Sequence, residues 1–156
     1  MGSRMPNPLV LVPELAELGG TFAKVFGNGS VPLTTISLVN LRAGQILGNT
    51  YATVRNAAAL RDAGESEERI SSVASWWDGS YFTDAEQAAL KLTEAVFQAS
   101  TASERVSDEL FAEVSKHYDD KALTTLVTII GQAAYSLAFA LVGKPVPGVP
   151  MAEQWT

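Results

Sequence analysis

The chain has 156 residues, which favours a single domain, and 47% of them are hydrophobic, enough for a substantial core. Seventeen acidic against eleven basic residues give a formal net charge of −6, and no basic cluster is present, which disfavours a nucleic-acid partner because binding to phosphates needs grouped Lys and Arg. There is no cysteine, which excludes a disulfide, a thiolate metal site and thiol redox chemistry within these residues.

The two ends of the chain are expected to lie outside the folded domain. The first residues, MGSRM, lack the apolar run of a signal peptide, and we interpret residues 1–5 as a cloning remnant. The absence of cysteine also fits a cytoplasmic location. Residues 6–143 are predicted to form one helical domain, followed by a Pro-rich, extended tail at 144–156.

Pro and Gly punctuate the first predicted helices. Pro13 precedes ELAELGGTFAKVFG, which predicts a first helix that ends at the Gly-Asn-Gly sequence of residues 27–29. Pro32 suits the first turn of a second helix. This second helix runs into, or abuts, a third helix from about Gly44 to Ala63, and the glycine that follows is a suitable C-terminal cap.

The second half of the chain is also predicted to be helical. A serine before Glu67–Ser75 can cap a short helix with an acidic first turn. A capping box at Thr83–Glu86 opens a helix to about Ala99, and Ser107 caps another to about Tyr118. The last helix runs from about Asp120 to Val142. We therefore predict an all-α fold of six or seven helices.

The last predicted helix resembles a membrane span in its length. The 22 residues between Lys121 and Lys144 are uncharged, which is enough to cross a bilayer. Four polar residues recur along it at steps of three and four: Thr125, Thr128, Gln132 and Ser136. Lipid would solvate this stripe poorly, so we predict a core helix of a soluble oligomer and no membrane partner.

The segment GNTYATVRN lies within the predicted third helix. Asn49, Ala52 and Asn56 recur at steps of three and four, so they share one face, which also includes Gln45. Ser37 lies 12 residues before Asn49. Side-chain amides donate and accept hydrogen bonds without titrating, so this face is a candidate ligand site.

The pattern Leu-x-x-Leu-Arg-Ala-x-Gln at residues 38–45, followed by Gly48 and a short spacing to Asn56, resembles the carboxymuconolactone decarboxylase / alkylhydroperoxidase-D-like family. A Trp-Trp turn at 76–77 and the segment at 82–90 follow in the same order as in that family. The resemblance implies an all-α fold that assembles as a homotrimer or a hexamer. It also implies a pocket near the start of the motif helix.

In the redox branch of the family, the resemblance implies a Cys-x-x-Cys motif, a His four residues later and a Glu 12 residues before the first Cys. The thiols would form a disulfide, and the His and Glu would transfer protons. Here these positions hold Asn49, Ala52, Asn56 and Ser37. A peroxidase or disulfide-reductase cycle is therefore excluded unless an external cofactor supplies the redox centre. The His and acidic residues of the decarboxylase branch are missing too.

Three functions are open. The favoured one is a cofactor-independent lyase, isomerase or cyclase for a small organic substrate, in which Asn49 and Asn56 are catalytic and act through hydrogen bonds and electrostatics. The second is a non-catalytic small-molecule-binding or structural relative. The third is an oxidoreductase that borrows a bound cofactor. No metal is expected, since the single histidine, His117, cannot form a zinc site alone.

Each candidate residue also has a structural alternative. The candidate substrate-binding residues are Ser37, Arg42, Gln45, Tyr51, Ala52, Trp76, Trp77, Gln132 and Tyr135. Arg42 can hold a carboxylate or form a salt bridge between helices. The aromatic residues of 76–82 can line a pocket or fill a core or interface. The two asparagines can instead restore helix and subunit contacts.

Overall fold

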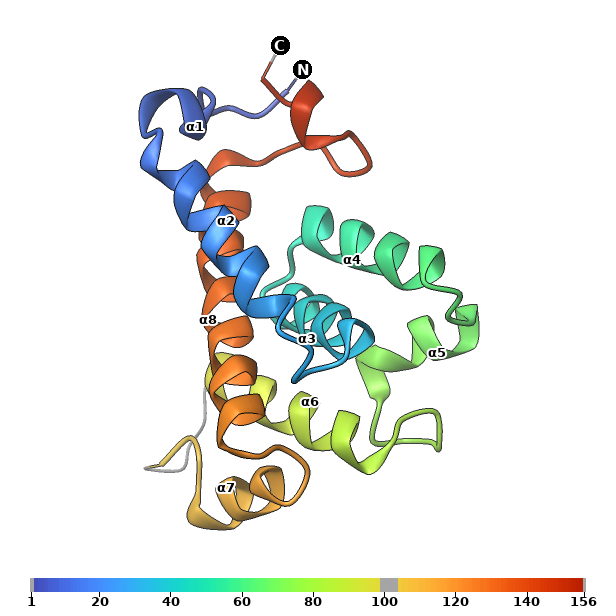
Figure 1. Ribbon diagram of the computed structural model, residues 1–156. Coiled ribbons are helices and arrows are strands. Elements are labelled where there is room, and N and C mark those ends of the chain that lie inside the picture. Colours follow the sequence, from blue (N-terminus) through green and yellow to red (C-terminus); the bar gives the residue numbers. More distant parts are fainter. Residues whose placement is uncertain (1, 99–103, 156) are drawn as a thin grey trace.

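The computed structural model describes residues 2–98 and 104–155, and all regular structure in this part is helical (Figure 1). The helices are α1 (Pro8–Leu11), α2 (Glu14–Phe26), α3 (Leu33–Ile46), α4 (Thr50–Asp62), α5 (Glu67–Ser72), α6 (Asp84–Phe97), α7 (Asp108–Ser115) and α8 (Asp120–Gly143), with 3₁₀ turns η1 (Val73–Ser75) and η2 (Met151–Glu153). The predicted all-α class is confirmed. The short helix α1 was not predicted; Asn7 caps it, and a proline occupies its first position.

Helix α3 is the central element, packed against α4, α6 and α8. Figure 1 shows α8 along one side of the domain with α2 beside it, while α6 and α7 lie at one end. One core cluster joins α3, α6, α7 and α8 around Leu126 and Ile129. A second cluster joins α3, α4, α5 and α6 around Leu38, Leu60 and Leu90. The fold therefore packs both α4 and α8 against the central helix, where they also contact each other.

The predicted boundary between the second and third helices is wrong. Helix α3 continues to Ile46, and α4 begins at Thr50 rather than near Gly44. Gly48 has a φ of +65°, in the left-handed region that glycine adopts at helix ends. Asn49 then caps α4, because its Oδ1 accepts a hydrogen bond from the backbone N–H of Ala52 at 2.9 Å. A helix stop and a helix start are thus adjacent in the sequence.

Gly44 allows α3 and α4 to approach each other closely. A Cβ placed on Gly44 would lie 3.0 Å from Cβ of Ala52 and 3.3 Å from Cγ2 of Thr53. Real Cβ atoms rarely make contacts this short, so a larger residue would force the helices apart.

The other helix boundaries differ only slightly from the predicted ones. The short helix predicted over 67–75 is divided into α5 and η1. The capping box of α6 is present in full, with Thr83 and Glu86 exchanging their hydrogen bonds. The predicted end of this helix at Ala99 lies outside the described residues, which show helix to Phe97.

The C-terminal tail is not extended, contrary to the prediction. The side chain of Gln154 is 1% exposed and closes the segment into a loop. Its Oε1 accepts from the N–H of Val146 at 2.8 Å, and its Nε2 donates to the carbonyls of Val146 and Val149 at 2.9 Å. One buried glutamine therefore holds a Pro-rich segment that forms little regular structure.

The N-terminal residues bind to this C-terminal segment. The backbone N–H of Ser3 donates to the carbonyl of Gln154 at 3.0 Å, and that of Arg4 donates to the carbonyl of Gly143 at 2.8 Å. The Ser3 hydroxyl adds a bond to the same Gly143 carbonyl at 2.9 Å. Figure 1 shows the two ends of the chain side by side. Residues 3–5, interpreted as a remnant, are thus packed against the domain.

By length and composition, α8 is able to cross a membrane, and 39% of its most apolar window is buried. It packs against α2, α3, α4, α6 and α7. Its polar stripe contacts other protein groups: the Thr125 hydroxyl accepts hydrogen bonds from Asn28 and Ser30, both at 3.0 Å. Further along, Gln132 donates to Ser136 at 2.5 Å.

Candidate functional site

A cavity of about 240 Å³, here called the polar cavity, lies between α4 and α8. Its polar lining residues are Asn40, Tyr51, Arg55, Asn56, Gln132 and Ser136. Two sequence features create it. The first turns of α4 present positions 51, 52, 55 and 56 toward α8, and the polar stripe of α8 presents positions 132 and 136 toward α4. Small residues at Ala52 and Ala133 leave the space open.

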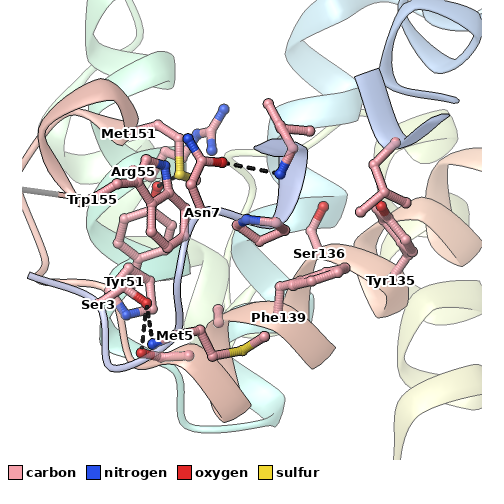
Figure 2. A pocket seen from close by; sticks show the side chains of 16 residues that line it. Ser3, Met5, Asn7, Tyr51, Arg55, Tyr135, Ser136, Phe139, Met151 and Trp155 are labelled. Atoms are coloured by element: carbon pink, nitrogen blue, oxygen red, sulfur yellow. Dashed lines mark hydrogen bonds between the residues drawn. The ribbon is translucent and has the colours of Figure 1, made fainter. Parts of the chain in front are cut away.

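A second cavity of about 220 Å³, here called the apolar cavity, adjoins the first (Figure 2). It lies between the C-terminal half of α8, the start of α4 and the two chain ends. Its large apolar lining residues include Met5, Tyr135, Phe139, Met151 and Trp155. Four residues line both cavities: Tyr51, Arg55, Ser136 and Ala140. The two cavities are therefore neighbours that share a wall.

Five of the predicted site residues line these cavities. Tyr51, Ala52, Asn56 and Gln132 line the polar cavity, and Tyr135 lines the apolar cavity together with Tyr51. Tyr135 also packs against Phe139, with ring centroids 5.3 Å apart. These five residues belong to α4 and α8, the helices on which the sequence analysis placed them.

Contrary to the prediction, Asn49 and Asn56 do not act as a pair on one helix face. Asn49 precedes α4, is 9% exposed, lines neither cavity and uses its side-chain oxygen to cap the helix. Asn56 lies in the second turn of α4, where its Nδ2 donates to the carbonyl of Ala52 at 2.8 Å. Gln45 belongs to α3 and so shares no helix with either. Gln45 is separated from both asparagines because α3 ends before Gly48, whose positive φ breaks the helix.

Arg42 forms a salt bridge between helices, the structural alternative considered from the sequence. Its Nε lies 2.9 Å from Oε1 of Glu94, and its Nη1 lies 3.4 Å from Oε1 of Gln45. Trp76 donates from Nε1 to the same Glu94 oxygen at 2.8 Å, and the Arg42 guanidinium lies 5.9 Å from the ring centroid of Trp77. This network lies apart from both cavities, since none of its members lines either.

The remaining predicted residues also lie away from the two cavities. Ser37 is a half-buried residue of α3. Trp76 and Phe82 belong to the second core cluster, whereas Trp77 and Tyr81 are exposed. His117 is exposed, and no group of three or more His, Cys, Asp or Glu side chains within the described residues is arranged to hold a metal ion.

Several lining residues were not assigned to the site by the sequence analysis, among them Asn40, Arg55 and Phe139 and, from the chain ends, Met5, Met151 and Trp155. A signal for Arg55 was present, because it lies four residues after Tyr51 and so shares its helix face. Ser136, known from the polar stripe, also reaches both cavities.

Neither cavity presents a carboxylate or an imidazole from the part of the chain that the structure describes. The ionisable side chains at the cavities are Tyr51, Arg55 and Tyr135. The clearest pKa shift of a tyrosine lies elsewhere: burial, aided by the charge of Glu86, raises the pKa of Tyr118 to about 12. The cavities can therefore hydrogen-bond and attract an anion, but they offer no carboxylate or histidine base.

Comparison with known proteins identifies the relatives of this chain. Residues 15–95 match the carboxymuconolactone decarboxylase family model, and this range includes α3 and α4. The chain belongs to the carboxymuconolactone decarboxylase family. It is 31% identical to the uncharacterized protein YdfG of Bacillus subtilis over 122 residues, which are 78% of this chain and 82% of that protein. The uncharacterized protein YnjA of Escherichia coli is 30% identical over 103 residues, covering 66% of this chain and 55% of YnjA.

Solved structures show the same family fold. A protein of unknown function from Agrobacterium tumefaciens, named as a candidate antioxidant defence protein AhpD, has a TM-score of 0.81 at 22% identity and covers 95% of this chain and 99% of its own. A variant of the debrominase Bmp8 in complex with 2,3,4-tribromopyrrole has a TM-score of 0.75 at 17% identity, with 88% and 72% covered. The resemblance to the carboxymuconolactone decarboxylase / alkylhydroperoxidase-D-like family is thus confirmed, as is its fold.

Proposed function

We propose that this family member binds a small organic molecule in the polar cavity and acts without thiol chemistry. The observation that supports this most directly is the lining itself. Ala52 and Asn56, which occupy the second Cys and the His positions of the redox motif, line a cavity whose other described polar side chains are neutral except for Arg55. The fold relative Bmp8 was solved with a small ring compound, 2,3,4-tribromopyrrole. A ligand of comparable size is the proposed occupant here.

Binding without turnover is the version that the geometry favours. Acid–base catalysis needs a group that exchanges protons near neutral pH, and the described lining residues provide none. Asn49, the first predicted catalytic residue, is engaged as a helix cap outside the cavity. The non-catalytic reading, second in the sequence analysis, therefore becomes the first.

A cofactor-independent lyase, isomerase or cyclase is the second candidate, and Tyr51 supports it. Tyr51 lines both cavities, and its hydroxyl hydrogen-bonds within the described residues to the weakly accepting sulfur of Met151 at 4.0 Å. A substrate could therefore accept a hydrogen bond from Tyr51, while Asn56 binds a second polar group. Such hydrogen bonds lower a barrier when they strengthen in the transition state.

Native mass spectrometry of freshly purified protein tests the proposal. We expect a co-purified small-molecule mass that is lost in Asn56→Ala. Gln87→Ala is the matched control, because Gln87 is also half-buried and also donates an amide hydrogen bond to a backbone carbonyl, at 3.1 Å, but lies away from both cavities. A bound mass that persists equally in both variants would contradict the proposal. Turnover of the released compound would favour the second candidate.

We further propose a homotrimer or hexamer of this chain as the assembled form, in the cytoplasm and with no nucleic-acid or membrane partner. Exposed apolar side chains support the assembly: Val10 is 73% and Leu11 64% exposed, and on α8 Val127 and Val142 are more than half exposed. Exposed apolar side chains mark interfaces where they gather into a patch. The same native spectrum tests it, since a monomer would contradict it. The net charge of −6 argues against a nucleic-acid partner.

A further inference from the structure

Arg55 differs from every other arginine of the chain. The five others are engaged: Arg42, Arg61 and Arg69 pair with glutamates, and Arg4 and Arg105 donate to backbone carbonyls. Arg55 makes no hydrogen bond and no salt bridge with any group in residues 2–98 and 104–155. Its guanidinium therefore has its full set of donors available for a ligand.

The position of Arg55 suits it to bind a ligand. Arg55 lines both the polar and the apolar cavity, and so does the phenol of Tyr51, one helical turn away on α4 (Figure 2). On one side lie neutral polar groups such as Asn56. On the other lies a chamber walled by aromatic rings and methionine sulfur. The two donors thus stand at the boundary between a polar and an apolar space.

We infer that the two cavities form one bipartite site for a small amphiphilic carboxylate, bound through its carboxylate to Arg55 and through its apolar body in the apolar cavity. This rests on the proposed small-molecule function and adds the substrate class. Guanidinium and carboxylate form paired, charge-assisted hydrogen bonds, and Tyr51 is placed to donate a third. The ring or short chain of the ligand gains contact with Tyr135, Phe139 and Met151.

A preference for a carboxylate over a neutral ligand must come from charges at the cavities and not from the net charge of the protein. With a formal net charge of −6, the protein as a whole repels anions. No Asp or Glu of the described chain lines either cavity, so the charge at the boundary is that of Arg55 alone. A carboxylate is therefore expected to bind better than a neutral compound of the same shape.

Isothermal titration of the full chain with trans-cinnamate and with its neutral isostere cinnamamide tests the inference. We expect the carboxylate to bind about tenfold more tightly, which corresponds to one charge-assisted contact. In Arg55→Gln this preference should disappear, and in Arg55→Lys it should be partly retained. Arg61→Gln is the matched control, because Arg61 lies on the same helix but pairs with Glu67 at the surface. Quenching of tryptophan fluorescence on titration that is absent in Trp155→Phe would place the ring in the apolar cavity, because Trp76 and Trp77 lie away from it.

Each other outcome overturns a defined part of this account. If cinnamate and cinnamamide bind equally well to the unaltered chain, carboxylate recognition is wrong while small-molecule binding stands. Equal loss of preference in Arg55→Gln and Arg61→Gln would remove Arg55 from the site. If neither compound binds, but a co-purified neutral mass is lost in Asn56→Ala, the bipartite site is wrong and the proposed function survives. If no compound and no co-purified mass binds, both fail.

Discussion

Arg42 and Glu94 form a salt bridge between α3 and α6, with Nε and Oε1 2.9 Å apart. Their side chains are only 10% and 19% exposed, and the same carboxylate oxygen accepts a hydrogen bond from the indole of Trp76. One carboxylate thus joins the central helix, α6 and the turn that follows η1. Arg42, the arginine of the Leu-Arg-Ala motif, therefore has a structural role in this protein.

Glu94→Gln should destabilise the fold, because it leaves a largely buried guanidinium without its counter-charge. We expect a loss of about 3 kcal/mol in the free energy of unfolding, measured by urea denaturation. The exposed pair of Lys91 and Glu113, with side chains 40% and 39% exposed, provides the control. Glu113→Gln should change stability by less than about 1 kcal/mol. Similar losses in the two variants would contradict a special role for the buried bridge.

Asn49→Ala should lower stability by about 1 kcal/mol, the usual effect of removing a helix N-cap. Asn49→Asp should retain most of it, since aspartate is also a good cap and its charge suits the start of a helix. Ligand binding at the polar cavity should be retained in Asn49→Asp. Thermal melting and the cinnamate titration measure these two properties separately. If binding is lost in Asn49→Asp while the melting temperature stays constant, Asn49 acts on the ligand after all.

Gly44→Ala should be destabilising by about 1–3 kcal/mol, because the added methyl group would meet Cβ of Ala52 at 3.0 Å. Gly131 in α8 is the control, since a Cβ there meets nothing within 4 Å. Gly131→Ala should instead stabilise the helix by about 0.5–1 kcal/mol. Chemical denaturation of both variants checks the opposite signs. A stabilising Gly44→Ala would mean that α3 and α4 separate without penalty.

Tyr118 makes the stability depend on pH in the alkaline range. Burial raises the pKa of its phenol to about 12, and the hydroxyl donates to the carbonyl of Ala85 at 2.8 Å. Since the unfolded chain releases this proton near pH 10, the contribution is complete below pH 10 and is lost as the pH rises through 12. We expect a loss of about 1 kcal/mol between pH 9 and pH 11.

Urea denaturation across this pH range measures the effect. Tyr118→Phe should lose about 1 kcal/mol at neutral pH through the missing hydrogen bond, and its stability should fall less steeply above pH 9. Tyr81→Phe, at an exposed position, should keep the slope of the unaltered chain. An unchanged slope in Tyr118→Phe would assign the alkaline loss to other groups.

Local signals in the sequence predicted most helix starts correctly. The capping box at Thr83 and the serine cap at Ser107 depend only on neighbouring residues, and both are present in the structure. The break at Gly48 was also a local signal, but the apolar periodicity on both sides concealed it. The role of Arg42 depended on Glu94, 52 residues later, which no local pattern specifies.

The candidate site could be predicted only in part for a similar reason. Asn56 and Gln132 were found because helical spacing places them on faces with other polar residues, whereas Tyr51 was named for its phenol and not for its spacing. The apolar cavity escaped prediction because the two chain ends wall it, and these had been set aside as a remnant and a loose tail. Arg55 stands out because no described carboxylate or carbonyl pairs with it, and only a three-dimensional structure can show that.

The backbone hydrogen bond of Ser3 to Gln154 joins the first and the last segments that the structure describes. A short Gly-Ser linker could therefore join them without disturbing any helix. New ends could then be opened in the exposed turn at Gly79 and Ser80, between η1 and α6. In such a circular permutant, the two segments that wall the apolar cavity would be joined in one loop. The sequence and length of this loop could then be varied while both of its ends stay attached to the domain.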